Sequence, residues 1–338
     1  MLCDLNVLWP KKENSSSKID FSELDKLLMT LTELKYTHVA LNYVVTPENV
    51  SDDEIIQMND YINSFYHKYF KDITIPKIKL YTRITIMMED PSKMQNVIKK
   101  AGTACVNNKS THSGPSTKSN ITNNTFDIIA IMPLNEKSLH NISTNLDCST
   151  VDLITFDYNN PYAPSYYFLK HKTISGISAK GIKIEIIYAP MLSSTGNSTV
   201  SRVKYINNVK QIIRCSGRNS CKNINHNNTS TNNTNDKNKK NTSNNKKNNL
   251  IISSGAANSL QVRNKLGVYS IMMQFNGMKN YKGVTKLLDD NPLLVLLNGR
   301  LRKKSYQQCI VTGDDVIADT QIGISDINGF AVRQKEHE

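Results

Sequence analysis

Three short apolar runs, separated by helix-like segments, lie between residues 126 and 190 and constrain the fold more than any other feature of the sequence. The runs cover residues 126–132, 151–157 and 182–188. After the first run, Asn135 stands where a helix N-cap is expected, and leucine and isoleucine then recur at helical spacing. Such alternation is typical of βαβ units, because a tight hairpin cannot join parallel strands. The stretch therefore predicts parallel strands with helical crossovers.

The same alternation continues on both sides of this stretch. Further strand-like runs lie at residues 2–8, 37–42, 78–88 and 250–253, residues 268–275 offer an eighth, and helical patterns include residues 258–266 and 292–301. Seven or eight parallel strands alternating with helices predict an α/β fold, a barrel of the TIM type, in one domain over residues 1–305. A loosely ordered tail is expected over residues 306–338. An open doubly wound sheet is the competing architecture, and the strand count favours the barrel.

Two polar segments interrupt the pattern, and the hydrophobic share of the chain is only 38%. One covers about residues 102–125 and is rich in Ser, Thr and Asn, and the other covers residues 222–248 and is almost entirely Asn, Lys, Thr and Ser. Segments with so few apolar side chains bury too little surface to offset the entropy of ordering them. We expect both to be disordered insertions that protrude from the barrel.

The net charge indicates the kind of partner. The chain carries +13, of which the six lysines and one aspartate of residues 222–248 contribute +5, so the remainder keeps +8. A basic globular body is typical of proteins that bind a polyanion, either nucleic acid or an anionic membrane surface. Charge that only keeps the protein soluble is the alternative.

Cysteine usage and hydropathy are typical of a reduced, intracellular protein. The six cysteines form no C-x-x-C pair and no histidine cluster accompanies them, so neither a disulfide framework nor a zinc site is expected. No run approaches the roughly 18 apolar residues of a membrane span, and the amino terminus lacks the pattern of a signal peptide. We expect no membrane partner.

Common nucleotide-binding and hydrolase motifs are missing from the sequence. It holds no phosphate loop, no G-x-G-x-x-G after a strand, no G-x-S-x-G elbow and no H-x-H pair. Barrel enzymes carry catalytic groups at the carboxyl ends of their strands, where this sequence offers Asp4, Asp157 and Glu185. These carboxylates could form a metal site, and hydrogen-bonded polar residues at the strand ends are the alternative.

Seven short sequence motifs, spread along nearly the whole predicted barrel, match those of a known protein family in their order and spacing. They are Asp4-Leu5-Asn6, YTHVALN at 36–42, YTRITI at 81–86, FDIIAIMP at 126–133, DLITFD at 152–157, IEIIYAP at 184–190, and ISSGA at 252–256 continuing to Arg263. Together they resemble the 30-kDa-type protein subunit of nuclear RNase P and RNase MRP. One departure is that Asn264 follows Arg263 where a proline is expected.

The resemblance implies a TIM-like barrel related to the polymerase-and-histidinol-phosphatase metal hydrolases. Those enzymes hold metal with His-x-His at the end of the first strand, where this chain has Asp4-Leu5-Asn6. Because both imidazoles are missing, we expect no catalytic residue, and no metal or cofactor bound by the protein itself. The implied role is to bind and scaffold a catalytic RNA, which itself holds magnesium, in 5′ maturation of precursor tRNA and in processing of precursor rRNA.

The implied partners are the RNase P and MRP RNAs, precursor tRNA in the holoenzyme, and other protein subunits that include a small α/β RNA-binding subunit. The implied location is the nucleus and nucleolus. Charge and position select the candidates for RNA contact, which are Arg83, Arg214, Arg263, Arg300, Arg302 and Lys303. Solvated surface charge is the alternative for these side chains. The alternative function is a metal-dependent phosphoesterase on the same barrel, built on Asp4, Asp157 and Glu185.

Overall fold

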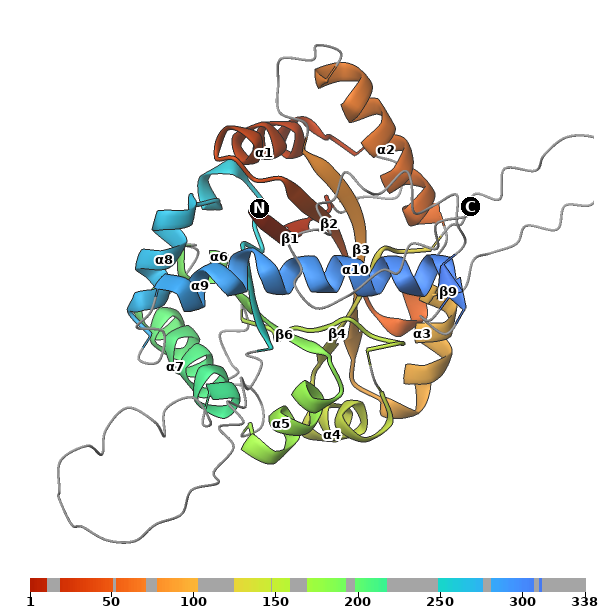
Figure 1. Ribbon diagram of the computed structural model, residues 1–338, viewed down its shortest axis with the longest axis vertical. Coiled ribbons are helices and arrows are strands. Elements are labelled where there is room, and N and C mark those ends of the chain that lie inside the picture. Colours follow the sequence, from red (N-terminus) through yellow and green to blue (C-terminus); the bar gives the residue numbers. More distant parts are fainter. Residues whose placement is uncertain are drawn as a thin grey trace, which may run out of the picture.

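The computed structural model describes most of the predicted barrel (Figure 1). The described residues are 1–10, 19–50, 53–70, 78–102, 125–146, 148–158, 169–192, 198–217, 249–275, 281–306 and 310–311. The two predicted insertions lie outside these ranges except at their margins. The predicted tail also lies outside them, except for residues 306 and 310–311.

Seven parallel strands form one sheet in simple sequential order, which confirms the α/β barrel. They are β1 (Cys3–Leu8), β2 (His38–Val45), β3 (Lys79–Met88), β4 (Ile128–Pro133), β5 (Leu153–Ile154), β6 (Lys183–Ile187) and β7 (Leu250–Ser253). The chain after β7 returns to β1, where Leu8 N donates to Ala256 O at 2.9 Å and Gly255 N donates to Asn6 O at 2.8 Å. The sheet is therefore a nearly closed barrel.

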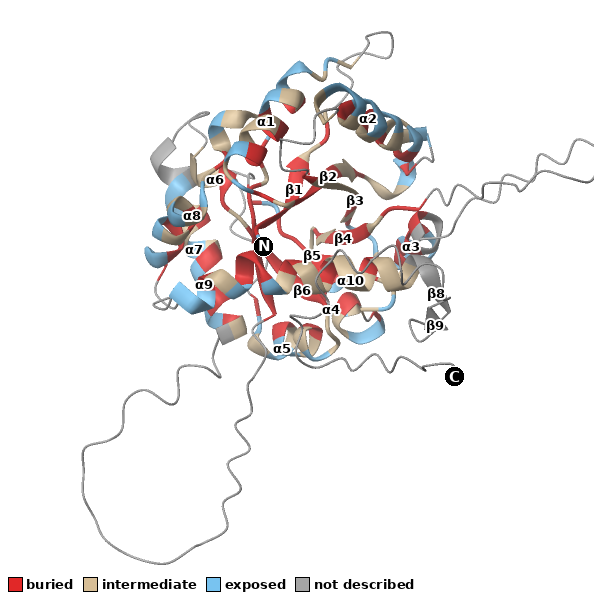
Figure 2. Ribbon diagram, turned by 45° about the horizontal axis from the view of Figure 1, so that its top comes forward, coloured by how far each residue is buried: buried red, intermediate tan, exposed pale blue. Residues whose placement is uncertain are grey.

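Helices surround the strands, with their buried faces turned to the sheet (Figure 2). They are α1 (Ser22–Glu33), α2 (Asp53–Tyr69), α3 (Met94–Gly102), α4 (Glu136–Asn145), α5 (His171–Ala179), α6 (Ala189–Leu192), α7 (Ser198–Gly217), α8 (Lys265–Met273), α9 (Tyr281–Leu288) and α10 (Asp290–Lys304). Short 3-10 helices are η1 (Pro47–Asn49), η2 (Pro91–Lys93) and η3 (Ser259–Gln261), and β8 (Ser305–Tyr306) pairs with β9 (Ile310–Val311). No helix in the described ranges has the length and apolar character of a membrane span.

Local sequence signals explain where several of these elements begin and end. The predicted cap Asn135 is confirmed, because its side chain accepts a hydrogen bond from Ser138 N at 2.7 Å at the start of α4. Gly181, with a φ of 85°, ends the segment that contains α5 in a left-handed conformation that glycine adopts without strain. The helix predicted over residues 292–301 is part of α10.

The predicted eighth strand over residues 268–275 is wrong, because most of this segment forms α8. Val268, Ile271 and Met272 are its buried residues, and this spacing of three and four is helical. The helix predicted over residues 258–266 is also wrong as a single element. It consists of η3 and the start of α8, which is capped by Asn264. A short apolar run fits a buried strand and a buried helix equally well, and here the spacing of the buried side chains distinguishes them.

The amino-terminal end of the barrel is apolar and is covered by α10. Apolar residues from several strands pack there against Val295 of α10, and the cluster consists of Cys3, Leu5, Ala40, Ile128, Ala130, Leu153, Ile251 and Val295. Asn291 Nδ2 donates to Leu250 O at 2.6 Å, at the start of β7. Near the other end of the helix, Arg302 Nη2 donates to Asp127 O at 3.0 Å, just before β4. In Figure 1, α10 crosses the middle of the molecule in front of the strands.

Candidate functional site

Two charged side chains meet across the inside of the barrel from strands that are not neighbours. Arg83 lies on β3 and Glu185 on β6, and both side chains have an exposed fraction of 0%. The guanidinium donates from Nη1 to Glu185 Oε1 and from Nη2 to Glu185 Oε2, at 2.6 Å in each case. Two parallel charge-assisted bonds of this kind are a strong arrangement for arginine and carboxylate. The interior of the barrel is therefore bridged by an ion pair.

Two further hydrogen bonds hold the guanidinium of Arg83. Nη1 donates to Leu5 O at 2.7 Å, and Nε donates to the Thr85 hydroxyl at 3.2 Å. These contacts tie the guanidinium to β1 and to its own strand as well as to β6. Because an arginine keeps its charge at any ordinary pH, burial without such partners would be very unfavourable.

Two asparagines extend the bonding around the carboxylate. Asn6 Nδ2 donates to Glu185 Oε2 at 3.2 Å, and Asn42 Nδ2 donates to Asn6 Oδ1 at 2.7 Å. The Thr85 hydroxyl donates to Asn42 Oδ1 at 2.7 Å. We call the connected set of Asn6, Asn42, Arg83, Thr85 and Glu185 the barrel network. It neutralises its own charges, and both carboxylate oxygens of Glu185 are engaged in hydrogen bonds within it.

The other candidate carboxylates do not join Glu185. Asp4 is buried, and its Oδ1 accepts from Ser254 N at 3.0 Å and from Asn6 N at 3.2 Å. Burial raises the pKa of Asp4 to about 6. Asp157 is exposed, on the chain that follows β5. Within the described residues, no group of three or more His, Cys, Asp or Glu side chains could hold a metal ion. The metal site of the related hydrolases therefore does not fit the residues present.

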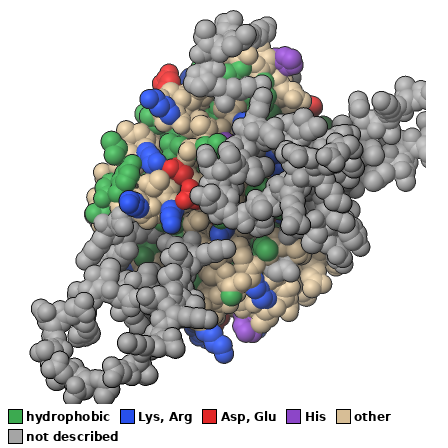
Figure 3. Space-filling model, in the orientation of Figure 1, with side chains coloured by type: hydrophobic (Ala, Val, Ile, Leu, Met, Phe, Trp, Pro, Cys, Tyr) green, Lys and Arg blue, Asp and Glu red, His purple; other side chains and the backbone are tan. Residues whose placement is uncertain are grey.

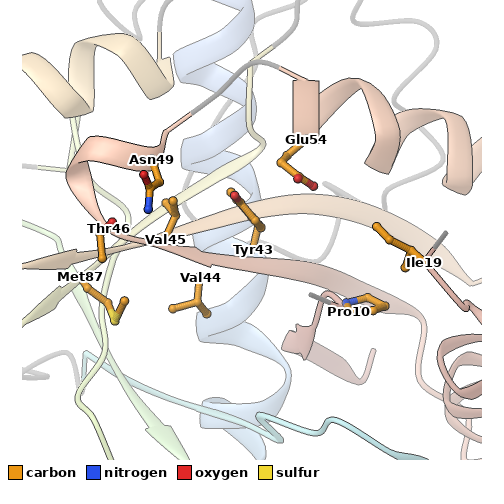
Figure 4. A pocket seen from close by; sticks show the side chains of 9 residues that line it. All are labelled: Pro10, Ile19, Tyr43, Val44, Val45, Thr46, Asn49, Glu54 and Met87. Atoms are coloured by element: carbon orange, nitrogen blue, oxygen red, sulfur yellow. The ribbon is translucent and has the colours of Figure 1, made fainter. Parts of the chain in front are cut away.

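A hollow of about 300 Å³ lies beside the ends of β2 and β3 (Figure 4). Its lining is mostly apolar, with polar groups at Tyr43, Thr46 and Asn49 and one carboxylate at Glu54. A single carboxylate provides neither a metal ligand set nor an acid–base pair. This hollow therefore does not supply the chemistry that the barrel network lacks.

Three of the candidates for RNA contact are engaged in contacts within the protein. Arg83 is wholly buried, so its selection as an RNA contact is corrected: the sequence shows its charge and not the direction of its side chain. Arg263 Nη1 donates to Leu260 O at 2.7 Å and to Val262 O at 2.8 Å. Arg302 pairs with the buried carboxylate of Asp152 at 2.5 Å, and its side chain is only 11% exposed.

The other three candidates lie on the outer helices. Arg214 is exposed on α7, and Arg300 is half-buried on α10. Lys303 belongs to α10, although its side chain lies outside what the structure describes. In Figure 1, α7 lies apart from the carboxyl-terminal end of α10.

Sequence reasoning missed the pairing of Arg83 with Glu185 and the role of Asn42. A partial signal was present, because a charged residue within a strand that helices cover needs an internal partner, although the signal does not say which residue that partner is. Arg83 and Glu185 are of opposite charge and both meet that description. The sequence alone could not show that the two strands face each other.

Comparisons with known proteins support the family suggested by the sequence. The profile of the family described as RNase P subunit p30 matches residues 1–107 and 104–224. The ribonuclease P/MRP protein subunit RPP1 of Saccharomyces cerevisiae is 32% identical over 98% of this chain and 94% of its own length. The ribonuclease P protein subunit p30 of Mus musculus is 22% identical over 85% of this chain and 84% of its own length.

A solved structure agrees with the fold. A chain in the cryo-EM structure of archaeal ribonuclease P with mature tRNA superposes with a TM-score of 0.54, at 14% identity, over 99% of both chains. At this identity the likeness concerns the fold alone, whereas the sequence matches concern the family. This chain therefore belongs to the RNase P subunit p30 family and is a protein subunit of the RNase P/MRP ribonucleoprotein.

Proposed function

We propose that this chain contributes binding and shape, and no chemistry of its own, to 5′ maturation of precursor tRNA and to processing of precursor rRNA. The barrel network is the observation that supports this proposal most directly. Where a barrel hydrolase would need metal ligands, this chain has a glutamate that accepts hydrogen bonds from Arg83 and Asn6, and Asn6 in turn accepts from Asn42. In this proposal the reaction uses magnesium held by the RNA, and the protein neutralises charge and holds the RNA in shape.

The proposed partners follow from the relatives. RPP1 is named as a subunit of both RNase P and RNase MRP, and the archaeal relative was solved in RNase P with mature tRNA. We propose the RNase P and MRP RNAs, precursor tRNA and a small α/β RNA-binding subunit as partners of this chain. The eukaryotic relatives imply a nuclear location, and we propose the nucleolus for the MRP form.

Arg214, Arg300 and Lys303 remain our proposed RNA contacts. Arg214 is exposed and Arg300 is half-buried at the surface, where guanidinium groups can reach phosphate oxygens. Phosphate contacts of this kind add affinity that falls as the salt concentration rises. Substitution of each side chain by alanine tests the proposal, because loss of a phosphate contact should make RNA affinity depend less steeply on salt concentration.

Two assays on the same protein test the function. Depletion of the chain from cells is expected to cause 5′-extended precursor tRNA and unprocessed precursor rRNA to accumulate. The purified chain is expected to release no product from phosphoester substrates, with or without manganese or zinc. Normal 5′ ends in depleted cells would contradict the assembly role. Metal-stimulated turnover abolished by Asp157→Ala would support the phosphoesterase instead.

A further inference from the structure

Helix α8 is apolar on both of its faces although it lies at the surface. Its sequence is KLGVYSIMM, in which Val268, Ile271 and Met272 are buried against the barrel. On the opposite side, Leu266 is 64% exposed and Met273 is also exposed. Lys265 and the exposed Ser270 are also part of this helix, but a helix with apolar side chains on both faces is normally covered on both. The outer face of α8 therefore lacks a covering element among the described residues.

Neighbouring side chains enlarge this exposed face. Leu260 on η3 is 82% exposed, and Tyr281 on α9 is exposed and lies 5.1 Å from Tyr269 of α8, measured between ring centroids. We call the set of Leu260, Leu266, Tyr269, Met273 and Tyr281 the α8 patch. Figure 3 shows hydrophobic side chains gathered at the left edge of the molecule, where Figure 1 places α8. Contiguous apolar surface of this kind marks an interaction site more often than scattered single residues do.

The exposed charges that α9 adds beside the α8 patch are basic. Lys282 and Lys286 are exposed on α9, while Lys265 of α8 is paired with the buried Asp289 at 2.7 Å. A partner that fits this surface would present apolar side chains bordered by carboxylates.

We infer that the α8 patch is the docking surface for another protein subunit of the ribonucleoprotein, one whose contact face is apolar with acidic residues at its border. The aliphatic side chains favour a protein over RNA. RNA bases stack on aromatic rings and arginine planes. The two tyrosines of the patch pack edge to face on each other, and Leu260, Leu266 and Met273 provide no stacking surface. The inference rests on the proposed assembly role, because it takes the partner from the same particle.

Photo-crosslinking in the intact particle tests the inference directly. A photo-reactive phenylalanine analogue replaces Leu266 in one tagged chain and Met273 in another, and the assembled particle is irradiated, treated with nuclease and analysed by mass spectrometry. Both positions are expected to crosslink to one other protein. The matched control is Val203, which is 56% exposed on α7 outside the patch and is expected not to crosslink to that protein. Crosslinks to RNA, crosslinks only within this chain, or no crosslinks would overturn the inference.

Substitutions in the α8 patch test the same inference through the recovery of other protein subunits with the tagged chain. The double substitution Leu266→Glu with Met273→Glu is expected to lower recovery of one protein subunit about tenfold or more, as loss of central apolar contacts does. Val203→Glu should leave recovery unchanged, and circular dichroism should show the same melting temperature for both variants and the unaltered chain. Loss of RNA with every protein subunit retained would assign the surface to RNA and overturn the inference.

The unaltered particle separates this inference from the proposed function. If the unaltered chain recovers RNA and precursor-tRNA cleavage while the α8 patch gives no protein crosslink, only the docking surface is wrong. If the unaltered chain recovers neither RNA nor other subunits, the assembly role and the inference both fail.

Discussion

Two regions of the barrel interior are stabilised by different means. At the amino-terminal end, apolar side chains fill the interior and α10 lies across the strands. Farther along, the interior holds the barrel network, in which Arg83 and Glu185 are both wholly buried. One region gains stability from removal of apolar surface from water, and the other depends on complete pairing of charges.

The difference shows which part of the barrel interior bears on our proposal of a binding role. Apolar packing under a helix is compatible with any function, because it serves only the fold. In the barrel network, by contrast, both oxygens of Glu185 already accept hydrogen bonds from Arg83, and one of them also accepts from Asn6. The barrel network is therefore the part of the interior on which our proposal depends.

Breaking the ion pair should have the largest effect on stability. Glu185→Leu leaves the guanidinium of Arg83 buried without its counter-charge, which costs about 3–5 kcal/mol in typical cases. Urea unfolding measures this loss. The matched control is the double substitution Arg83→Met with Glu185→Leu, which removes both charges and should recover most of the stability. Equal losses in the single and the double variant would show that charge pairing is not what stabilises this region.

The pH dependence of stability should report on Asp4, which borders the network. Burial raises its pKa from 3.8 to about 6, so the folded chain binds this proton more tightly than the unfolded chain does. Stability contributed by the protonated group is therefore present below about pH 4 and is lost as the pH rises to about 6. A shift of about two pKa units corresponds to roughly 3 kcal/mol.

Asp4→Asn isolates this contribution, because the amide resembles the protonated carboxyl. Between pH 4 and pH 7, the unaltered chain should lose up to about 3 kcal/mol relative to the variant in denaturant unfolding. Parallel stability curves for the two proteins over this range would contradict the raised pKa.

At the amino-terminal end, a smaller effect should follow from Gly299→Ala in α10. An added Cβ would lie 2.0 Å from Asp127 O, so the helix must move away from the barrel, at a cost of about 1–3 kcal/mol. Gly176→Ala in α5 is the control, because its added Cβ would meet nothing within 4 Å, and alanine favours a helix by about 1 kcal/mol. Thermal unfolding should give opposite signs for the two variants. Stabilisation in both would mean that α10 does not pack closely on β4.

The smallest effect should come from the surface. Arg300 is half-buried and interacts electrostatically with Tyr81, so Arg300→Ala is expected to cost about 1 kcal/mol or less of stability. It is also expected to weaken binding to RNase P RNA in a salt-dependent way. The slope of log affinity against log salt should fall by about 1 if one phosphate contact is removed. Arg302→Ala provides the contrast. It should destabilise the fold, because it leaves the buried carboxylate of Asp152 without its arginine partner. An unchanged salt slope for Arg300→Ala would remove that residue from the RNA contacts.

The sequence predicts features of this structure that depend on neighbouring residues, and it does not predict contacts between residues far apart in the chain. The strands and most helices follow from local periodicity, and the cap at Asn135 was confirmed as predicted. Residues 268–275 were misassigned because a short apolar run does not distinguish a strand from a helix. The pairing of Arg83 with Glu185 joins residues 102 positions apart, so no local pattern could reveal it. The sequence likewise could not show which basic side chains are buried.

The most direct test of the central claim is precursor-tRNA cleavage by particles assembled with the Arg83→Met, Glu185→Leu chain. If this barrel contributes binding and shape only, kcat/KM should stay within about twofold of the unaltered particle, because the fold is retained and no reacting group is lost. A loss of about a hundredfold or more, in particles that contain every subunit and the RNA in normal amounts, would contradict the account and would place the barrel network in the reaction.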